Sequence, residues 1–226
     1  MPTRRQHSST PLGNWPYAHP THRTANPGSR ILGDSLQDLG NCSRLGPAGI
    51  LGVRAMKIPV FVSSPTSLSP SQEAARTVII RQLDDNDLEA RALGRSDYPT
   101  ELPLREVLLI ARHCSGGIIL GFEQFRASGG VKKRGTSAEE QISTSIPFPT
   151  PWNHLESGIL FGLHLPTLVF REDGITGGIF DTGVSDVFIH PMPPANIRGA
   201  AKDALRQVFQ RWAGRVREHY YNDKRA

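Results

Sequence analysis

One glutamate stands among aromatic and small residues in the segment 152–158, Trp-Asn-His-Leu-Glu-Ser-Gly. Thr150 can cap a helix that begins at Pro151, because the first helical position does not need the backbone donor that proline lacks. Glu156 would then lie well inside this helix, where a carboxylate gains little as a surface charge. Gly158 would cost the helix about 1 kcal/mol relative to alanine. Both features are explained if another group must approach the carboxylate closely.

The chemistry that suits Glu156 best is that of a sugar carbon developing positive charge. The carboxylate could attack the anomeric carbon as a nucleophile, or stabilise an oxocarbenium-like transition state. Spacing alone favours the plainer alternative, a glutamate on the surface of the helix. Trp152 could stack on a base, and Asn153 and His154 lie in the same turns as further candidates for substrate binding. A core position for Trp152 and a capping or surface position for His154 remain open.

Two other segments could bind an anion. Ser63, Ser64, Pro65 and Thr66 follow an apolar run, and they offer hydroxyl and N–H groups at the start of a helix, although the P-loop pattern is absent. The turn 94–99 contains a guanidinium, a carboxylate and a phenol, contributed by Arg95, Asp97 and Tyr98. Arg95 could grip a phosphate or a carboxylate. An ordinary turn with a local Arg–Asp pair is the alternative.

A third segment, Gly121-Phe122-Glu123, follows another apolar run. Glu123 is a second candidate carboxylate, and an aromatic edge at this point could flank a base. The glycine-rich loop 174–178 lacks a dinucleotide-binding fingerprint, and we expect it to be only a loop.

Strand-like and helix-like patterns alternate along the chain and set the fold class. We expect strands at 58–62, 88–93, 117–121, 166–170 and 186–190, and helices at 70–83, 103–114, from 151 onward, and 196–220. The expected buried residues of the last three helices are Leu104, Val107, Leu108 and Ala111; Leu155, Ile159 and 161–163; and Ile197, Ala201, Leu205, Val208, Trp212 and Val216. Residues 122–149 read as a polar excursion or lid. The alternation predicts an α/β fold, with a doubly wound, mostly parallel sheet covered by helices on both faces.

In such sheets ligands bind beyond the carboxyl ends of the strands, where the strand order reverses. The candidate residues of the preceding paragraphs follow predicted strands or enter the helix that carries Glu156. This convergence is the strongest physical argument for a binding site at that edge.

Charge and composition exclude several classes of protein. The net charge is +5, but residues 56–195 carry 12 basic and 16 acidic residues, so the positive charge lies in the two ends of the chain. We therefore expect no DNA or RNA partner, since a phosphate-backbone reader needs a basic face on its folded body. No apolar run is long enough to cross a bilayer, so no membrane association is expected. Two cysteines, Cys42 and Cys114, form no disulfide framework or zinc motif, and Cys114 reads as a reduced packing residue in a cytoplasmic protein.

The chain divides into three predicted parts. Residues 1–55 lack periodicity and are rich in Pro, Gly, Ser, Thr and Arg, whereas Met56 opens directly onto a core strand. We expect 1–55 to be a disordered tail or an upstream translated extension, with a transit peptide as the alternative. Residues 56–195 form the α/β domain, and 196–226 a basic amphipathic helix packed on it. The basic residues of that helix read as its solvated face.

Three motifs together resemble the nucleoside 2-deoxyribosyltransferase-like superfamily, which is related to TIR-like domains. They are 60–66 (VFVSSPT), the turn from Gly94-Arg95 to Tyr98-Pro99, and 152–158 (WNHLESG) before Leu165-Pro166. The resemblance covers roughly residues 56–190. It implies a flavodoxin-like sheet, a nucleotide or nucleoside ligand, and chemistry at the N-glycosidic bond. It also implies that Glu156 is the catalytic glutamate, and that Arg95 and Tyr98 lie near the sugar or base.

The chain also departs from the family pattern. Residues 113–116 (HCSG) stand where the transferases usually carry an aspartate, and Ser63-Ser64 stand where an aromatic residue is frequent. These departures argue against transfer between free deoxynucleosides. Hydrolysis of NAD or a nucleotide remains open, with no other cofactor required, and so does nucleotide sensing without turnover, as in bacterial defence or signalling. A homo-oligomer or a partner protein is compatible with either function. A scaffold protein with a vestigial pocket is the third alternative.

Overall fold

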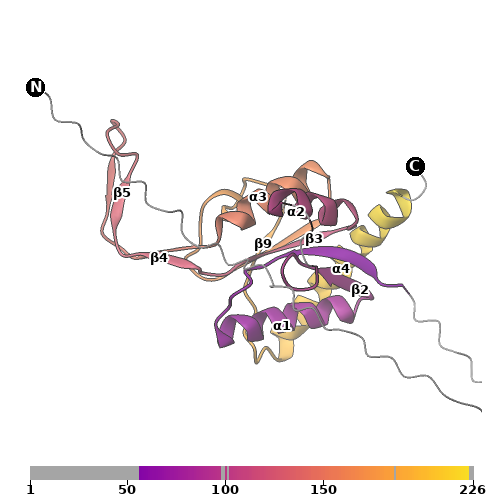
Figure 1. The fold of residues 1–226 in the computed structure, drawn as a ribbon. Helices are drawn as coiled ribbons and strands as arrows, with labels where there is room; N and C mark the ends of the chain where they lie inside the picture. Colours follow the sequence, from indigo (N-terminus) through magenta and orange to yellow (C-terminus); the bar gives the residue numbers. More distant parts are fainter. Residues whose placement is uncertain (1–55, 98–99, 101, 186, 224–226) are drawn as a thin grey trace, which may run out of the picture. The chain divides into compact units, whose positions relative to one another are not determined.

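The computed structural model describes residues 56–97, 100, 102–185 and 187–223. The predicted extension, 1–55, therefore lies outside the described residues. The centre of the described part is a parallel sheet of five strands in the order β2-β1-β3-β8-β9 (Figure 1). Their bounds are Ile58–Ser63 for β1, Leu88–Arg91 for β2, Gly117–Gly121 for β3, Thr167–Arg171 for β8 and Ile189–Pro191 for β9. Numbered along the chain, the sheet order is 2-1-3-4-5, which is the flavodoxin-like arrangement and confirms the predicted fold class.

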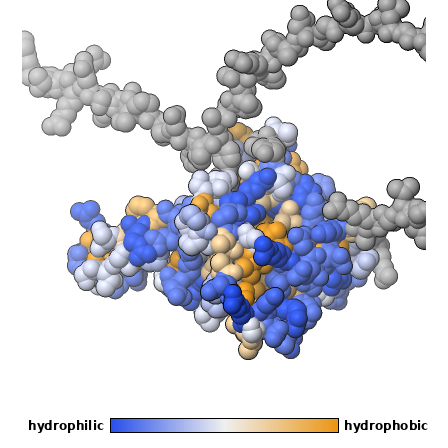
Figure 2. Space-filling view, turned by 90° about the horizontal axis from the view of Figure 1, so that it is seen from below, coloured by the Kyte–Doolittle hydropathy of each residue, from blue (hydrophilic) through white to orange (hydrophobic). Residues whose placement is uncertain are grey.

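Helices cover both faces of the sheet. One face packs on α1 (Pro70–Asp84) and α4 (Gly199–Asp223). The apolar cluster between them includes Val60 of β1, Ile79 of α1 and Trp212 of α4. Figure 2 looks onto this face, where hydrophobic residues remain visible within a mainly hydrophilic surface. The other face packs on α2 (Pro103–Arg112) and α3 (Pro151–Gly162). Successive residues of β1 alternate between the two clusters, as the pleat of a strand buried on both faces requires.

Local sequence signals place the beginnings of the helices. The Ser69 hydroxyl accepts a hydrogen bond from the Gln72 N–H, and the Gln72 side-chain oxygen accepts one from the Ser69 N–H, which forms a capping box at α1. At α3, the Thr150 side chain accepts from the backbone of Trp152. Proline occupies the first turn of α1, α2 and α3, as predicted.

The buried faces of α2 and α3 differ from the prediction. Leu104 is exposed and Ile110 is buried in its place. Leu155 and Phe161, both expected to be buried, are exposed, Phe161 by 67%. These apolar residues therefore lie on the outer side of α3, and most of the residues on its inner side are polar.

The excursion between β3 and α3 is more ordered than the sequence predicts. Two antiparallel ribbons follow one another within it, one formed by β4 (Phe125–Ala127) and β7 (Ile146–Phe148), the other by β5 (Gly130–Lys132) and β6 (Glu140–Ile142). These three-residue strands are too short to show a clear period of two. A short 3₁₀ helix, η1 (Gly178–Phe180), lies in the glycine-rich loop after β8.

Candidate functional site

The inner face of α3 is polar. Its buried residues are Asn153, Glu156, Ser157 and Leu160, which share one side of the helix because they are spaced by three, four and seven positions. Only the last is apolar. Ser157 finds a partner within the helix, because its hydroxyl donates to the His154 carbonyl over 2.8 Å. Asn153 and Glu156 must find theirs in the sheet or in a ligand.

This polar face lies across the point where the strand order reverses. From the adjacent strands β1 and β3, the chain continues toward opposite edges of the sheet. Ser63 ends β1, and Leu120 precedes the last residue of β3. Asn153 joins the two ends, since its Nδ2 donates to the Ser63 Oγ over 2.7 Å and to the Leu120 carbonyl over 3.4 Å. The sheet therefore places α3 at the position where doubly wound folds bind their ligands.

Glu156 is a buried carboxylic acid with a shifted protonation equilibrium. Its residue is 9% exposed, and burial raises the pKa from its ordinary 4.5 to about 7, while a hydrogen bond with the Ser63 side chain acts in the opposite direction. The Asn153 amide donates to the Ser63 oxygen, which leaves the hydroxyl proton to point at the carboxylate. Near neutral pH both forms of Glu156 are populated, so it can accept a proton, donate one, or act as an anion.

Asn153 carries an acceptor with no partner. The residue is fully buried, and among the described residues no donor meets its Oδ1. The amide cannot simply be reversed, because its nitrogen faces the Leu120 carbonyl. A buried acceptor without a donor costs free energy. A donor that reached this oxygen would remove that cost.

Trp152 and His154 lie on other sides of α3. Trp152 is half-buried and packs on the apolar cluster beneath α2 and α3. Of its two predicted roles, stacking on a base or packing in the core, the structure shows core packing. His154 is exposed, and its ring meets Phe180 edge-on at 5.5 Å between centroids. A side chain at Gly178 would lie 2.9 Å from the His154 Nδ1. His154 therefore supports the η1 loop.

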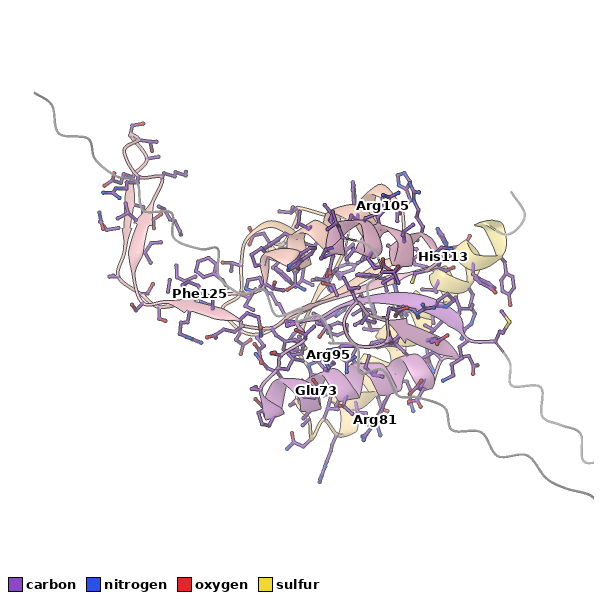
Figure 3. All side chains as sticks on the ribbon, in the orientation of Figure 1. Glu73, Arg81, Arg95, Arg105, His113 and Phe125 are labelled. Atoms are coloured by element: carbon purple, nitrogen blue, oxygen red, sulfur yellow. The ribbon has the colours of Figure 1, made fainter. Side chains whose placement is uncertain are left out.

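Arg95 is held by the protein itself. Its Nε and Nη2 donate to the Pro65 carbonyl, Nη2 also donates to the Thr66 carbonyl, and the guanidinium pairs with Glu73 at 3.1 Å. Figure 3 shows Arg95 beside Glu73 on α1. These contacts clamp the loop after β1, and they leave Arg95 poorly placed to grip the predicted phosphate.

The other residues of the turn after β2 make local contacts. Asp97 pairs with Arg91 and not with Arg95, and this pairing holds the pKa of the Asp97 carboxyl below its ordinary value. Tyr98 lies outside the described residues. The Arg–Asp pair expected of an ordinary turn is therefore present, with a different arginine.

The remaining predicted site residues divide between the edge of the sheet and its core. Ser64 is half-buried, Pro65 is buried and Thr66 is exposed, all in the loop clamped by Arg95. Gly121 is buried against the Phe180 ring. Phe122 is fully buried in the core and offers no edge to a base, whereas Phe125 of the same segment is exposed in β4. The Glu123 carboxylate pairs with Arg126.

Sequence reasoning missed a polar cluster at the same edge. Glu172 follows β8, and its Oε2 accepts from the Glu123 backbone over 2.6 Å and from the Gln72 side chain over 3.0 Å. A hollow of about 340 Å³ opens beside it, lined by Ser71, Ala75, Arg171, Glu172, Asp173 and 192–195. The rule that led to Glu123, a carboxylate two residues after the end of a predicted strand, would also have found Glu172.

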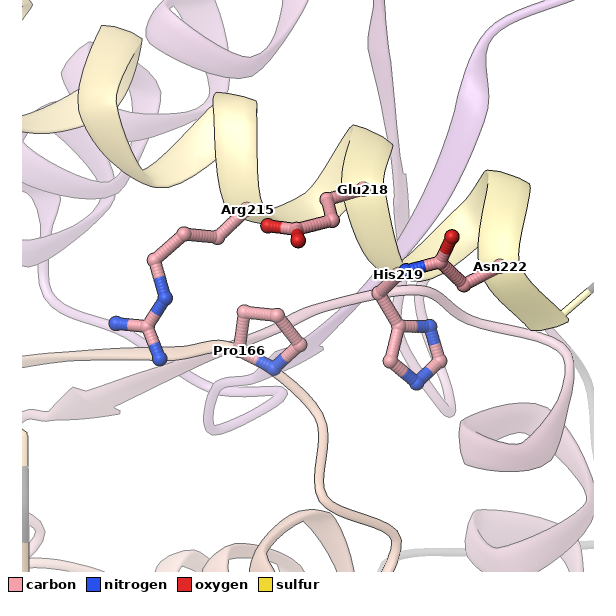
Figure 4. Close-up of a pocket in the computed structure, with 5 residues that line it drawn as sticks. All are labelled: Pro166, Arg215, Glu218, His219 and Asn222. Atoms are coloured by element: carbon pink, nitrogen blue, oxygen red, sulfur yellow. The ribbon is translucent and has the colours of Figure 1, made fainter.

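A second hollow of about 340 Å³ lies elsewhere. Pro166, Arg215, Glu218, His219 and Asn222 line it (Figure 4). Pro166 precedes β8, so this hollow lies at the amino end of that strand, opposite the edge that carries Glu156.

Among the described residues, no group of His, Cys, Asp and Glu is arranged to hold a metal ion, and no helix is long and apolar enough to cross a membrane. Burial raises the pKa of the free Cys114 thiol to about 12, as suits an unreactive packing residue.

No protein-family model matches the chain, and no curated protein is significantly similar to it.

Proposed function

We propose that the chain cleaves or exchanges the N-glycosidic bond of a nucleotide or NAD, with Glu156 as the catalytic group. The observation that carries the proposal is the position of Glu156, a buried carboxyl group with a pKa near 7 where the strand order reverses. Structural ion pairs also shift pKa values, but Glu156 has no cationic partner among the causes of its shift. The resemblance to nucleoside 2-deoxyribosyltransferases supports the same residue by an independent route.

The proposed reaction begins with ionised Glu156 facing the anomeric carbon of the sugar. As the bond from this carbon to the base breaks, the base takes the bonding electrons, and the carboxylate either bonds to the carbon or stabilises its positive charge. In hydrolysis, water then bonds to this carbon, any bond to the carboxylate breaks, and the proton that the water loses passes to the departed base or to solvent. In exchange, a second base attacks the carbon in the same way. The Ser63 hydroxyl stabilises the ionised carboxylate. Asn153 Oδ1 is suited to accept from a sugar hydroxyl.

Hydrolysis is the form of the reaction that we favour. The motif departures at 63–64 and 113–116 argue against exchange between free deoxynucleosides, which leaves NAD and nucleotides as the preferred substrates. The cytoplasm is the proposed location, because it supplies these substrates and keeps cysteines reduced.

The decisive experiment incubates the full chain with NAD and a panel of nucleosides and nucleotides, and measures release of the free base. Wild type should release base from at least one substrate, and Glu156→Gln should lose this activity. Glu218→Gln is the matched control, since it removes an exposed carboxylate at the opposite end of the sheet. Equal activity of wild type and Glu156→Gln would refute the catalytic role.

A nucleotide-sensing module without turnover is the second candidate. The deep burial of Glu156 and the engagement of Arg95 by Glu73 favour it, because both restrict access to reacting groups. Sensing predicts that a nucleotide raises the melting temperature of the full chain, with no base released and with little change in Glu156→Gln. Absence of any such stabilisation would favour a scaffold with a vestigial pocket.

A further inference from the structure

The excursion 125–148, which we call the arm, exposes apolar side chains that nothing in the described chain covers. Phe125 is 64% exposed, and Phe148 and Val131 are exposed as well. Phe125 lies directly opposite Phe148 in the first ribbon, with ring centroids 6.2 Å apart. Figure 1 shows the two ribbons in succession, with no helix packed over them.

Such an arm is unfavourable for a chain alone in water. A two-stranded ribbon is marginally stable by itself, and its outer edges offer unpaired backbone groups to other chains. An exposed aromatic pair on the ribbon adds a hydrophobic patch of the kind that marks an interaction site. The root of the arm is anchored, because Pro147 is buried close to Gly174. The rest needs a partner.

We propose that the partner is a second copy of this chain, and that the arm of each copy docks on the α3–β9 region of the other. Lys132 is the last residue of β5 and pairs with Glu140 at 4.0 Å, and Lys133 and Arg134 follow it in the turn. All three are exposed. Among the described residues of this region, the exposed or partly exposed acidic residues are Glu172, Asp173 and Asp181, against a single arginine, Arg171. The chain thus contains both halves of a complementary pair of charges.

The α3–β9 region, like the arm, exposes apolar side chains. Phe188 is 85% exposed, and Val184, Leu155 and Phe161 are exposed as well. A two-fold pair uses both contacts twice, once for each arm. Stable interfaces bury roughly 1,600 Å² in total, so each arm need supply only about half of that area. This interface is independent of any catalytic role for Glu156.

The test begins with sedimentation equilibrium of the full chain. Wild type should have twice the chain mass of 24.8 kDa. Phe125→Ser/Phe148→Ser should weaken self-association about a hundredfold, since buried aromatic anchors dominate interfaces. Lys132→Glu/Lys133→Glu should weaken it about tenfold. The matched control is Lys202→Glu/Arg211→Glu, which makes the same charge change on exposed positions of α4 and should leave the mass unchanged. Circular dichroism checks that each variant is folded.

Cross-linking identifies the surface that the arm contacts. In an equal mixture of ¹⁵N-labelled and unlabelled chains, a lysine-to-carboxylate cross-linker should join Lys132 or Lys133 of one copy to residues 172–181 of the other. A wild type that remains monomeric overturns the proposal, and so does a dimer that both arm variants leave intact. A monomer that binds duplex DNA through Lys132 and Lys133 also overturns it, and assigns the arm to nucleic acid.

Discussion

At the scale of single residues, Glu156 makes the stability of the protein depend on pH. Because burial raises its pKa from 4.5 to about 7, the folded chain holds a proton that the unfolded chain releases between these values. Its contribution to stability is therefore complete below about pH 4.5, falls as the pH rises, and is lost above about pH 7. The loss amounts to about 3 kcal/mol.

Glu156→Gln isolates this effect, since glutamine does not titrate. The free energy of unfolding of the variant minus that of wild type should increase by about 3 kcal/mol as the pH rises from about 4.5 to about 7. Urea denaturation at a series of pH values measures the difference. A difference that stays constant across the window would contradict the raised pKa.

We predict that Ser63 sets the pKa of Glu156, in addition to any contact that it makes with a substrate. Its hydrogen bond lowers the pKa of the carboxyl group, so Ser63→Ala should raise that pKa further above 7. The titration of the Glu156 side-chain carbon in ¹³C NMR measures the change. Ser64→Ala is the matched control, because the Ser64 hydroxyl makes only a 3.4 Å contact with the adjacent Pro65 carbonyl. An unchanged pKa in Ser63→Ala, or an equal rise in both variants, would contradict the assignment.

At the scale of elements, the strands buried on both faces were predictable and the inner face of α3 was not. The run 117–121 is continuously apolar, and β3 has those bounds. In α3, the apolar Leu155 and Phe161 point outward while Asn153, Glu156 and Ser157 point inward. Hydrophobic periodicity assigns the apolar side to the core, so it fails wherever a site needs polar groups inside. The position of Glu156 was predictable only through the strand-end rule and the motif resemblance.

Two glycines predicted to serve the site differ in what surrounds them. A side chain at Gly121 would lie 2.5 Å from the ring of Phe180, which is fully buried. At Gly158 no atom of the described chain lies within 4 Å of that position, so packing within the chain does not require this glycine. The two sites therefore respond oppositely to the same substitution.

Gly121→Ala should lower the free energy of unfolding by about 1–3 kcal/mol, because Phe180 must move in a filled core. Gly158→Ala should raise it by about 1 kcal/mol, since alanine favours the helix and meets no neighbour. Urea denaturation of both variants compares them directly. Loss of stability in Gly158→Ala would mean that something approaches α3 at this position.

At the scale of the whole molecule, α4 closes one face of the sheet. Phe209, Trp212 and Val216 are buried in the same cluster as residues of β1, β3 and β8. The Trp212 indole also donates to the Pro166 carbonyl over 3.0 Å, next to the start of β8. The amphipathic pattern predicted this helix and the burial of Trp212 and Val216, because periodicity works well where a helix has one core face and one solvated face. It was wrong for Ala201, which is exposed, and it missed Phe209, which is fully buried.

Trp212→Ala tests whether α4 is part of the cooperative core or an appendage to it. Removing a buried tryptophan should cost about 3–5 kcal/mol, and the loss should reach the whole sheet because the cluster spans it. Native-state hydrogen exchange should then show reduced protection in β1 and β3 as well as in α4. Trp212→Phe should cost less, because the Pro166 carbonyl keeps the Gly117 N–H as a donor. Lost protection confined to α4 would make the helix a separate unit, and the five-stranded sheet would then be stable without that layer.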